Sequence, residues 1–199
     1  MEHEVTGHDW FHIERVVKTA KKIAKYEKNI DIFIIELAAL LHDIGDWKVC
    51  DSEKSEEEVL DEVAQQFMFP NDIKEKVIKI VLNMSYSKNL NGRNILSREG
   101  DIVQDADRLD ALGAVGIARA FAYGGKKNRE MYNPLVKPEV FNSTNSYRTA
   151  NGTTINHFYE KLFSLKELMN TETAKRIARK KEKFMKKFLD EFYKEWEAK

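Results

Sequence analysis

The sequence lacks the features that mark several large classes of protein. Cys50 is the only cysteine among 199 residues, which excludes an internal disulfide framework and a cysteine-rich zinc site and fits a reducing compartment. Lysine plus arginine and aspartate plus glutamate number 33 each, so no overall basic field favours general DNA or RNA binding. No run approaches the roughly eighteen apolar residues of a membrane span, and the start MEHEVTGHDW is unlike a signal peptide. We expect a soluble cytoplasmic protein that binds neither nucleic acid nor a membrane.

Strand-like alternation is nearly absent, whereas apolar residues recur at spacings of three and four, which predicts an all-α protein. In the first predicted helix this apolar stripe runs from Ile13 to Ala24, and Asp9 is a candidate N-cap. Residues 31–44 are apolar almost all round, which predicts a central helix buried on every side. Further helices are expected at 56–68, 71–84, 99–122, 154–169 and 171–197.

Residues 123–153 differ from the rest of the chain, which we interpret as a single domain over 1–199. They show no periodicity, are rich in Asn, Ser and Thr, and contain Pro134 and Pro138, two of the three prolines. A structureless stretch of about thirty residues within a compact chain is unusual and tends to be functional. We expect a lid or an extended loop here.

The stretch LAALLHDIGDWK, residues 37–48, places an imidazole and a carboxylate side by side at His42 and Asp43. Ionised groups at the end of a buried helix are costly unless something compensates their charge, so a partner is expected. A metal ion is one such partner. Further ligands could come from His12, at the edge of the first apolar stripe, and from Asp107 in VQDADRLDALGA.

Asp107 has two acidic neighbours in the same segment. Asp110 lies three residues further on and shares its helical face, while Asp105 is turned about 200° away if the helix is regular. Gly113 and Gly116 extend the Asp107 face with small residues, so another helix could approach closely there.

The order His, His-Asp, Asp resembles the HD-domain superfamily of metal-dependent phosphohydrolases, and in particular its small prokaryotic branch. The resemblance rests on four ordered blocks, GHDWFHIERV, LAALLHDIGDWK, VQDADRLDALGAVGIARAFAYGG and TINHFYEKL. It extends from residue 7 to about residue 196 and implies an HD-type helical bundle with a C-terminal amphipathic helix. One departure is at Lys181 and Glu182, where the family pattern leads us to expect an Arg-His pair. This departure weakens the case for a substrate contact by the last helix.

The resemblance implies a site for a divalent metal ion. Imidazoles and carboxylates without a thiolate suit Mn, Fe, Co, Ni or Mg better than a closed structural zinc site. An octahedral ion would keep about two positions for water and a substrate oxygen. Members that bind two ions use additional histidines, and only His3, His8 and His157 remain here, so we expect one ion. Its implied ligands are His12, His42, Asp43 and Asp107.

Asp107 is the implied last ligand because it aligns with the last aspartate of the family pattern. Its rivals, Asp105 and Asp110, are expected to hold a histidine or an arginine instead. Asp46 stands where related hydrolases carry an acid that polarises the attacking water, so it is the candidate catalytic residue. The alternative interpretation of Asp46 is a solvated carboxylate at a helix end.

Several basic and amide side chains near these blocks are candidate contacts for substrate phosphate. Arg15, Lys48 and Arg108 lie close in sequence to the implied ligands, and each could equally pair with a local acid. His157 and Lys161 share a helical face next to the expected lid, although His157 could instead hold the lid structurally. The candidate substrate-binding residues are Arg15, Lys48, Arg108, Asn156, His157 and Lys161.

The implied reaction is hydrolysis of a phosphate ester by water that a metal ion activates. The family branch suggests a nucleoside triphosphate, cut to the monophosphate and pyrophosphate. Two alternatives stay open, a phosphomonoesterase acting on nucleoside monophosphates and a non-catalytic metal-dependent nucleotide sensor. An acid at position 46 favours an enzyme.

The basic cluster ARKKEKFMKKF could suggest nucleic-acid binding, but its surroundings show an ordinary amphipathic helix with a solvated face. We expect this helix to pack on the domain or on a second subunit, which allows a homodimer. Its apolar positions are Ile177, Phe184, Met185, Phe188, Leu189, Phe192 and Trp196.

Overall fold

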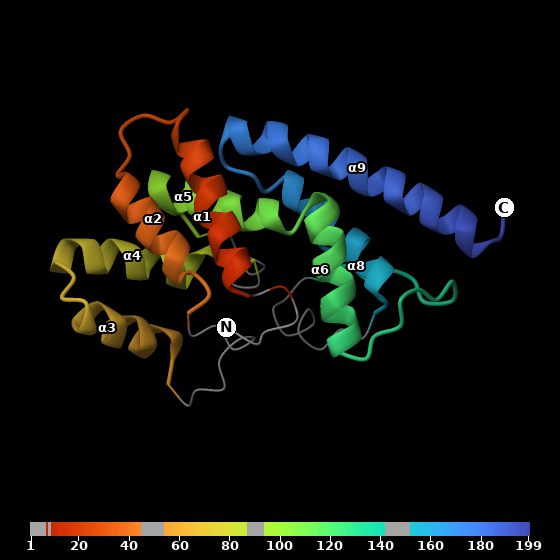
Figure 1. The fold of residues 1–199 in the computed structure, drawn as a ribbon, viewed down its shortest axis with the longest axis horizontal. Coiled ribbons are helices and arrows are strands. Elements are labelled where there is room, and N and C mark those ends of the chain that lie inside the picture. Colours follow the sequence, from red (N-terminus) through yellow and green to blue (C-terminus); the bar gives the residue numbers. More distant parts are fainter. Residues whose placement is uncertain (1–6, 8, 45–53, 87–93, 142–151) are drawn as a thin grey trace.

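The computed structural model describes residues 7, 9–44, 54–86, 94–141 and 152–199, and within these ranges every regular element is a helix (Figure 1). This confirms the all-α prediction. None of the described helices is long and apolar enough to cross a membrane. The elements are α1 (Trp10–Ala24), α2 (Ile32–Leu41), α3 (Glu56–Gln66), α4 (Asn71–Met84), α5 (Arg98–Asp110), α6 (Gly113–Lys126), α8 (Thr154–Glu160), the 3-10 helix η2 (Leu162–Lys166) and α9 (Glu172–Trp196).

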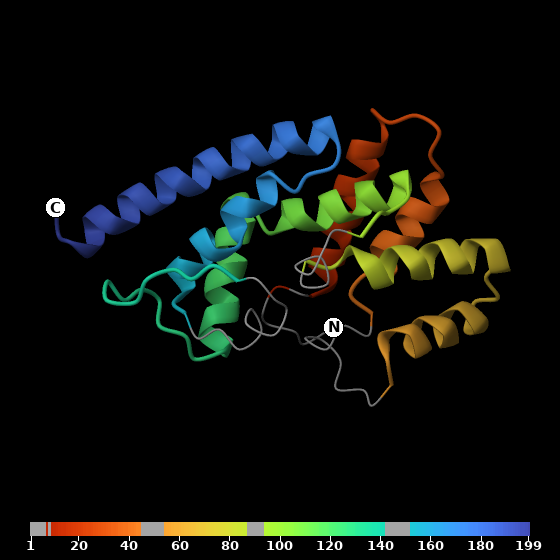
Figure 2. The same cartoon turned by 180° about the vertical axis from the view of Figure 1, so that it is seen from behind.

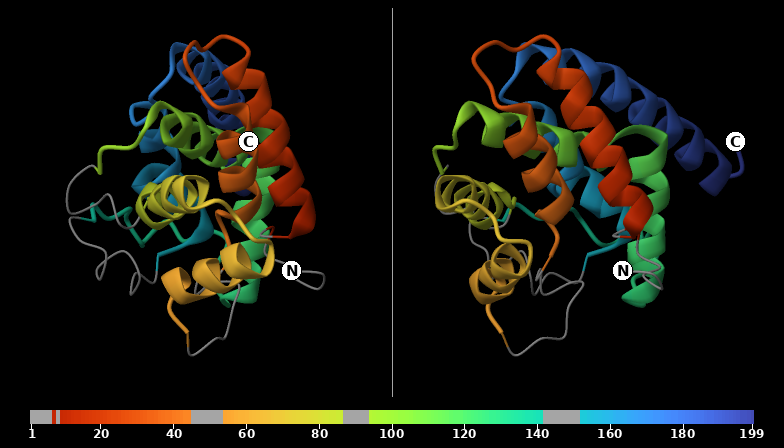
Figure 3. Two further views of the ribbon diagram at one scale, coloured as in Figure 1. Left: turned by 90° about the vertical axis from the view of Figure 1, so that its left-hand side faces the viewer. Right: turned by 60° about the vertical axis from the view of Figure 1, so that its left-hand side comes forward.

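Helix α5 connects the two halves of the fold. In one half it packs against α1, α2 and α4, with α3 lying on α4, and in the other it meets α6 and α9. Figure 2 shows α5 between α4 and α9, and both views of Figure 3 show α1 beside α2. The helix is buried along much of its length, including the fully enclosed Val103 and Ala106. The packing of α5 therefore fixes the position of its last turn, which carries Asp107, relative to the neighbouring helices.

Helix α1 follows the sequence prediction closely. Asp9 is its N-cap, and its carboxylate accepts a hydrogen bond from the backbone N–H of His12 at 2.8 Å. The predicted apolar stripe from Ile13 to Ala24 faces the core, with Val16 and Ala20 completely buried. His12 is enclosed on the same side.

The expectation that helix 31–44 is buried on every side is wrong. The side of α2 that carries Ile35 and Ala38 is buried, and the helix packs on α1, α4 and α5. However, Phe33 is 59% exposed and Leu40 is 42% exposed. These contacts therefore cover only part of its circumference.

The predicted helix 99–122 is broken into α5 and α6. Gly113 has a φ of +74°, in the left-handed region that residues with a Cβ rarely adopt, and the chain turns there. A Cβ on Gly113 would lie 3.1 Å from Cγ of Lys181 in α9, which confirms the expected close approach of another helix. A Cβ on Gly116 would lie 2.2 Å from the carbonyl oxygen of Ala111, at the end of α5. Both glycines therefore allow the chain to turn between α5 and α6 and allow neighbouring groups to pack closely there.

The predicted loop 123–153 begins later than expected, because α6 continues to Lys126. Gly124 is a packing residue, since a Cβ there would lie 2.2 Å from the hydroxyl oxygen of Thr154 in α8. Residues 127–141 form no helix or strand and are bound to α8, for example by the backbone N–H of Thr154, which donates to the carbonyl of Glu130. Residues 142–151 lie outside the described ranges, so the lid stays a prediction.

The predicted helix 154–169 is also divided, into α8 and η2. The backbone of Lys161, with φ −137° and ψ −54°, leaves the α-helical region between them. No glycine or proline stands near Lys161 to signal this break in the sequence.

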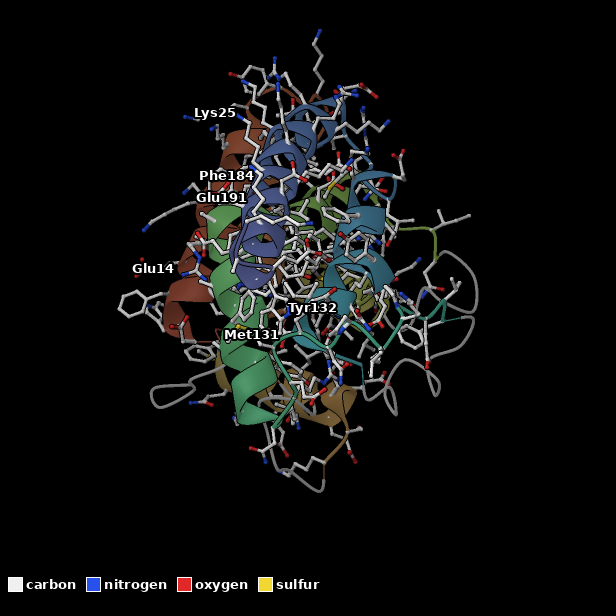
Figure 4. The ribbon with its side chains drawn as sticks, turned by 90° about the vertical axis from the view of Figure 1, so that its right-hand side faces the viewer. Glu14, Lys25, Met131, Tyr132, Phe184 and Glu191 are labelled. Carbon is white, nitrogen blue, oxygen red and sulfur yellow. The ribbon has the colours of Figure 1, made fainter. Side chains whose placement is uncertain are left out.

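Helix α9 runs along one edge of the molecule and packs on α5, α6 and η2 (Figures 1 and 2). Met185 and Leu189 are buried on its inner side, whereas Phe184 lies on its outer side (Figure 4). Tyr132 packs edge-on against Phe192, with ring centroids 5.9 Å apart. The predicted amphipathic helix is confirmed and packs on its own domain, while contact with a second subunit stays a prediction.

Replacing Gly113 with alanine should lower the free energy of unfolding by about 1–2 kcal/mol, because an L-residue is strained at positive φ. Chemical denaturation measures this change. Gly125→Ala is the matched control. Nothing lies within 4 Å of a Cβ at that helical position, so alanine should leave stability unchanged or raise it by up to about 1 kcal/mol. Equal stability of the Gly113→Ala protein and its parent would contradict the strained turn.

Candidate metal centre

Four predicted ligands converge where three helices meet. His12 lies in the first turn of α1, His42 and Asp43 follow the last residue of α2, and Asp107 lies in the last turn of α5. The two imidazole Nε2 atoms are 3.1 Å apart. Nε2 of His12 lies 3.4 Å from Oδ2 of Asp43 and 3.6 Å from Oδ1 of Asp107. His12, His42 and Asp107 each offer one ligand atom, all within 4.8 Å of one another, so these residues could hold a metal ion.

Hydrogen bonds on the far side of each ring orient the two histidines. Nδ1 of His12 lies 2.7 Å from Oδ2 of Asp110, and Nδ1 of His42 lies 2.8 Å from the carbonyl oxygen of Ala39. Because an ionised carboxylate and a carbonyl only accept, these bonds place a proton on each Nδ1. In the neutral rings both Nε2 lone pairs then face each other. A cation between them removes this repulsion, so the donor set fits a divalent metal ion.

The surroundings of His12 favour positive charge. Burial lowers the pKa of His12, but hydrogen bonds with the Asp110 and Asp43 carboxylates outweigh it and raise the pKa above its ordinary value. The same position can therefore accept either a proton or a metal ion, which compete for the Nε2 lone pair.

Asp110 binds the imidazole of His12 at Nδ1, on the side of the ring away from the other candidate ligands. Besides Nδ1 of His12, its carboxylate accepts hydrogen bonds from Nε of Arg15 at 2.8 Å and from Nη1 of Arg119 at 2.8 Å. Burial raises the pKa of Asp110, but the hydrogen bonds from His12 and Arg15 and the charge of Arg119 together hold it far below its usual range. Asp110 is therefore ionised, and it holds both a histidine and an arginine, as expected for a rival of Asp107.

Arg119 was missed by the sequence reasoning. Arg119 lies in α6, three residues after Gly116, which packs against the end of α5. This spacing is the only feature of the sequence that suggests a position of Arg119 near α5. The turn at Gly113 breaks the helical register between Arg119 and Asp110, so their pairing does not follow from periodicity.

Asp105 lies in a different environment, turned away from the cluster as its position in the helix predicts. Its carboxylate accepts hydrogen bonds from the backbone N–H groups of Asn170 and Thr171, both at 2.8 Å, and from the Thr171 hydroxyl. Burial raises its pKa despite these bonds. Asp105 therefore holds the start of α9.

Two of the predicted phosphate contacts pair with groups of the protein. Arg15 pairs with Asp110, although about a third of its side chain is exposed. Arg108 is buried, and its guanidinium donates to the carbonyl of Leu168. The ion pair of Arg15 matches the alternative interpretation of a local acid as partner, whereas Arg108 donates to a backbone carbonyl. Asp46 and Lys48 lie outside the described residues.

The remaining phosphate candidates lie in α8 or directly after it. Asn156 is buried and donates to the carbonyl of Val136 at 3.0 Å. His157 is half-buried, and burial, with the positive charges of Lys161 and Arg129, lowers its pKa to about 3. Nζ of Lys161 lies 4.9 Å from the centroid of the Tyr86 ring. A neutral imidazole thus stands beside two cations, and substrate contact by these residues stays a prediction.

The fold and the cluster together define an all-helical protein with a mixed nitrogen and oxygen site of the kind found in HD domains. A model of the family "HD domain" matches residues 10–112. Three crystal structures are similar to this chain over nearly its whole length. A Lactobacillus plantarum protein is 41% identical, with a TM-score of 0.88, over 99% of this chain and 91% of that one. An HD-superfamily hydrolase from Bacillus thuringiensis is 41% identical, with a TM-score of 0.73, over 100% and 91%.

The third structure is Bacillus subtilis YpgQ in complex with ADP, which is 38% identical, with a TM-score of 0.74, over 96% of this chain and 88% of that one. The chain belongs to the HD-domain family, as the motif order predicts. HD domains bind divalent metals, which agrees with the cluster of His12, His42 and Asp107. The family also supports a hydrolase.

Asp107→Asn should abolish tight binding of Mn²⁺ and the thermal stabilisation that the ion confers, because a charged ligand is lost. Asp105→Asn is the matched control from the same helix. It should keep most of the metal affinity while losing about 1–3 kcal/mol of stability, since a buried acceptor of several hydrogen bonds is changed. Calorimetric titration with Mn²⁺ and unfolding curves separate the two effects. The reverse pattern would move the ligand to Asp105.

His157 should make the metal-free protein less stable in acid. Its folded pKa of about 3 lies below the ordinary 6.5, so the unfolded state binds the proton first and stability falls as pH drops below 6.5. Between pH 7.5 and pH 5 the loss should reach up to about 2 kcal/mol. His157→Gln should lose this part of the pH dependence, measured by urea unfolding at both pH values. An unchanged slope would show that His157 titrates normally.

Proposed function

We propose that this chain is a metal-dependent nucleotide hydrolase that converts a nucleoside triphosphate to the monophosphate and pyrophosphate. The observation that carries the proposal is the convergence of the two Nε2 atoms of His12 and His42 with the carboxylate of Asp107. The ADP complex of YpgQ supports a nucleotide as the substrate class. The position of cleavage rests on the resemblance to the small prokaryotic HD hydrolases.

One divalent ion, Mn, Fe, Co, Ni or Mg, would be held by His12, His42, Asp43 and Asp107. When bound, such an ion supplies Lewis acidity for a phosphoryl oxygen and lowers the pKa of water. Asp110 keeps the proton on Nδ1 of His12, so that Nε2 can present its lone pair to the ion. Asp46 accepts the proton of the attacking water in this proposal.

The candidate phosphate contacts would neutralise the charge of the substrate. Near the cluster, Arg15 keeps an exposed edge while it pairs with Asp110, and Lys48 follows Asp46 closely in sequence. In α8, a neutral His157 can donate a hydrogen bond to a phosphate oxygen, while Lys161, directly after this helix, supplies charge.

Incubating the purified protein with a panel of nucleotides and divalent ions, with phosphate and pyrophosphate assayed separately, tests the function. We expect pyrophosphate from triphosphates. Phosphate released only from monophosphates would instead indicate a phosphomonoesterase. Nucleotide binding without either product would indicate a sensor.

Asp46→Asn is the matched variant for the same assay. Because it keeps the shape of the side chain but removes the base, turnover at saturating substrate and metal should fall by roughly 10² to 10⁴. Metal content should stay near that of the parent. A rate within about threefold of the parent would remove Asp46 from the mechanism.

A further inference from the structure

The Lys-Glu pair that replaces the expected Arg-His pair occupies a defined position in the structure. The ammonium group of Lys181 donates to the carbonyl oxygens of Leu109 at 2.8 Å and Leu112 at 3.1 Å. These residues flank the end of α5, and the lysine side chain reaches them across Gly113. Glu182 is buried and pairs with Lys166 of η2 at 3.0 Å, which holds α9 against η2.

We propose that Lys181 is a positioning residue of the metal centre, acting through the end of α5 and Asp110 without touching the substrate. The inference rests on the proposed metal site and extends it to α9, which lies outside the matched segment 10–112.

One of the two carbonyls that Lys181 holds, that of Leu109, lies in the last turn of α5. The last carbonyl groups of a helix carry its partial negative charge, which favours a cation there, and the Leu109 carbonyl also accepts a hydrogen bond from the backbone N–H of Leu112 at 3.2 Å. The other carbonyl belongs to Leu112, the residue directly before α6. One ammonium group thus binds the chain on both sides of Asp110 and Ala111, so it restricts the backbone from which the Asp110 carboxylate extends.

The connection to the ligands is short. Asp110 holds Nδ1 of His12 at 2.7 Å, and the opposite nitrogen of that ring faces His42 and Asp107. A shift of Asp110 would therefore rotate the imidazole that carries a ligand atom. Burial lowers the pKa of Lys181, while the carboxylate of Asp110 opposes that effect and the charge of Arg15 adds to it, so the ammonium interacts electrostatically with both groups.

Calorimetric titration of metal-free protein with Mn²⁺ tests the inference. Lys181→Met should raise the Kd for Mn²⁺ by about 10- to 100-fold, the usual cost of losing a residue that supports a ligand. Lys181→Arg should restore the affinity to within about threefold, because it keeps the charge and donors. At saturating Mn²⁺ the KM for nucleotide should stay within about twofold of the parent, because substrate contacts are unchanged.

Lys187→Met is the matched control, since Lys187 is an exposed lysine of the same helix. It should bind Mn²⁺ like the parent. If it loses as much affinity as Lys181→Met, the effect is general destabilisation and the inference is overturned. If Lys181→Met does not fold, Lys181→Gln, which keeps a donor without charge, takes its place and should show the same direction of change.

A second signal comes from the metal-free protein. The Nδ1–H proton of His12, observed by NMR, should lose protection from exchange in Lys181→Met, or in Lys181→Gln if that variant is used, but not in Lys187→Met. A folded Lys181 variant with the parent's Kd and the parent's exchange rate would overturn the inference alone. A parent that binds no Mn²⁺ would overturn both this inference and the proposed function.

Discussion

The carboxylate of Asp110 is the group on which the rest of the site depends. A buried ionised carboxylate is costly unless it is paired and hydrogen-bonded, and Asp110 satisfies this need with partners from two neighbouring helices, α1 and α6. The same bonds that compensate its charge fix the ring of His12. The contacts of α1 and α6 with the end of α5 and the orientation of a ligand atom therefore involve the same side chain.

The cluster lies at helix ends, and this position suits its chemistry. The middle of the bundle is filled by apolar side chains such as Val16, Ile35 and Val103, all completely buried, where an ion would lose its hydration without ligands. At the helix ends the environment is asymmetric, since the side chain of His12 is 0% exposed whereas that of Asp107 is 33% exposed. Protein thus encloses one side of the cluster, and solvent or a substrate oxygen can approach the other.

Local signals made part of this arrangement predictable. The position of α1 was predicted from its apolar periodicity and its start from Asp9. Periodicity and N-capping both depend only on residues that are close in sequence. The motif order identified the four residues that converge. The exposed side of α2 was not predictable, because it depends on how many helices pack around α2. The pairing of Arg119 with Asp110 was not predictable either, because it depends on the direction of the chain after Gly113. A glycine that fits a helical face and a glycine that breaks the helix look alike in one sequence.

The family match ends at Leu112, one residue before the left-handed turn at Gly113. Residues 10–112 contain His12, His42, Asp43, Asp107 and Asp110, so they include every implied ligand and the carboxylate behind His12. They lack Arg119, whose guanidinium helps to compensate Asp110. The charge balance of the cluster is therefore completed by the second half of the chain. A lysine in α9 that binds the carbonyls on both sides of Asp110 and Ala111 adds a second link from this half, in place of the Arg-His pair expected from the family pattern.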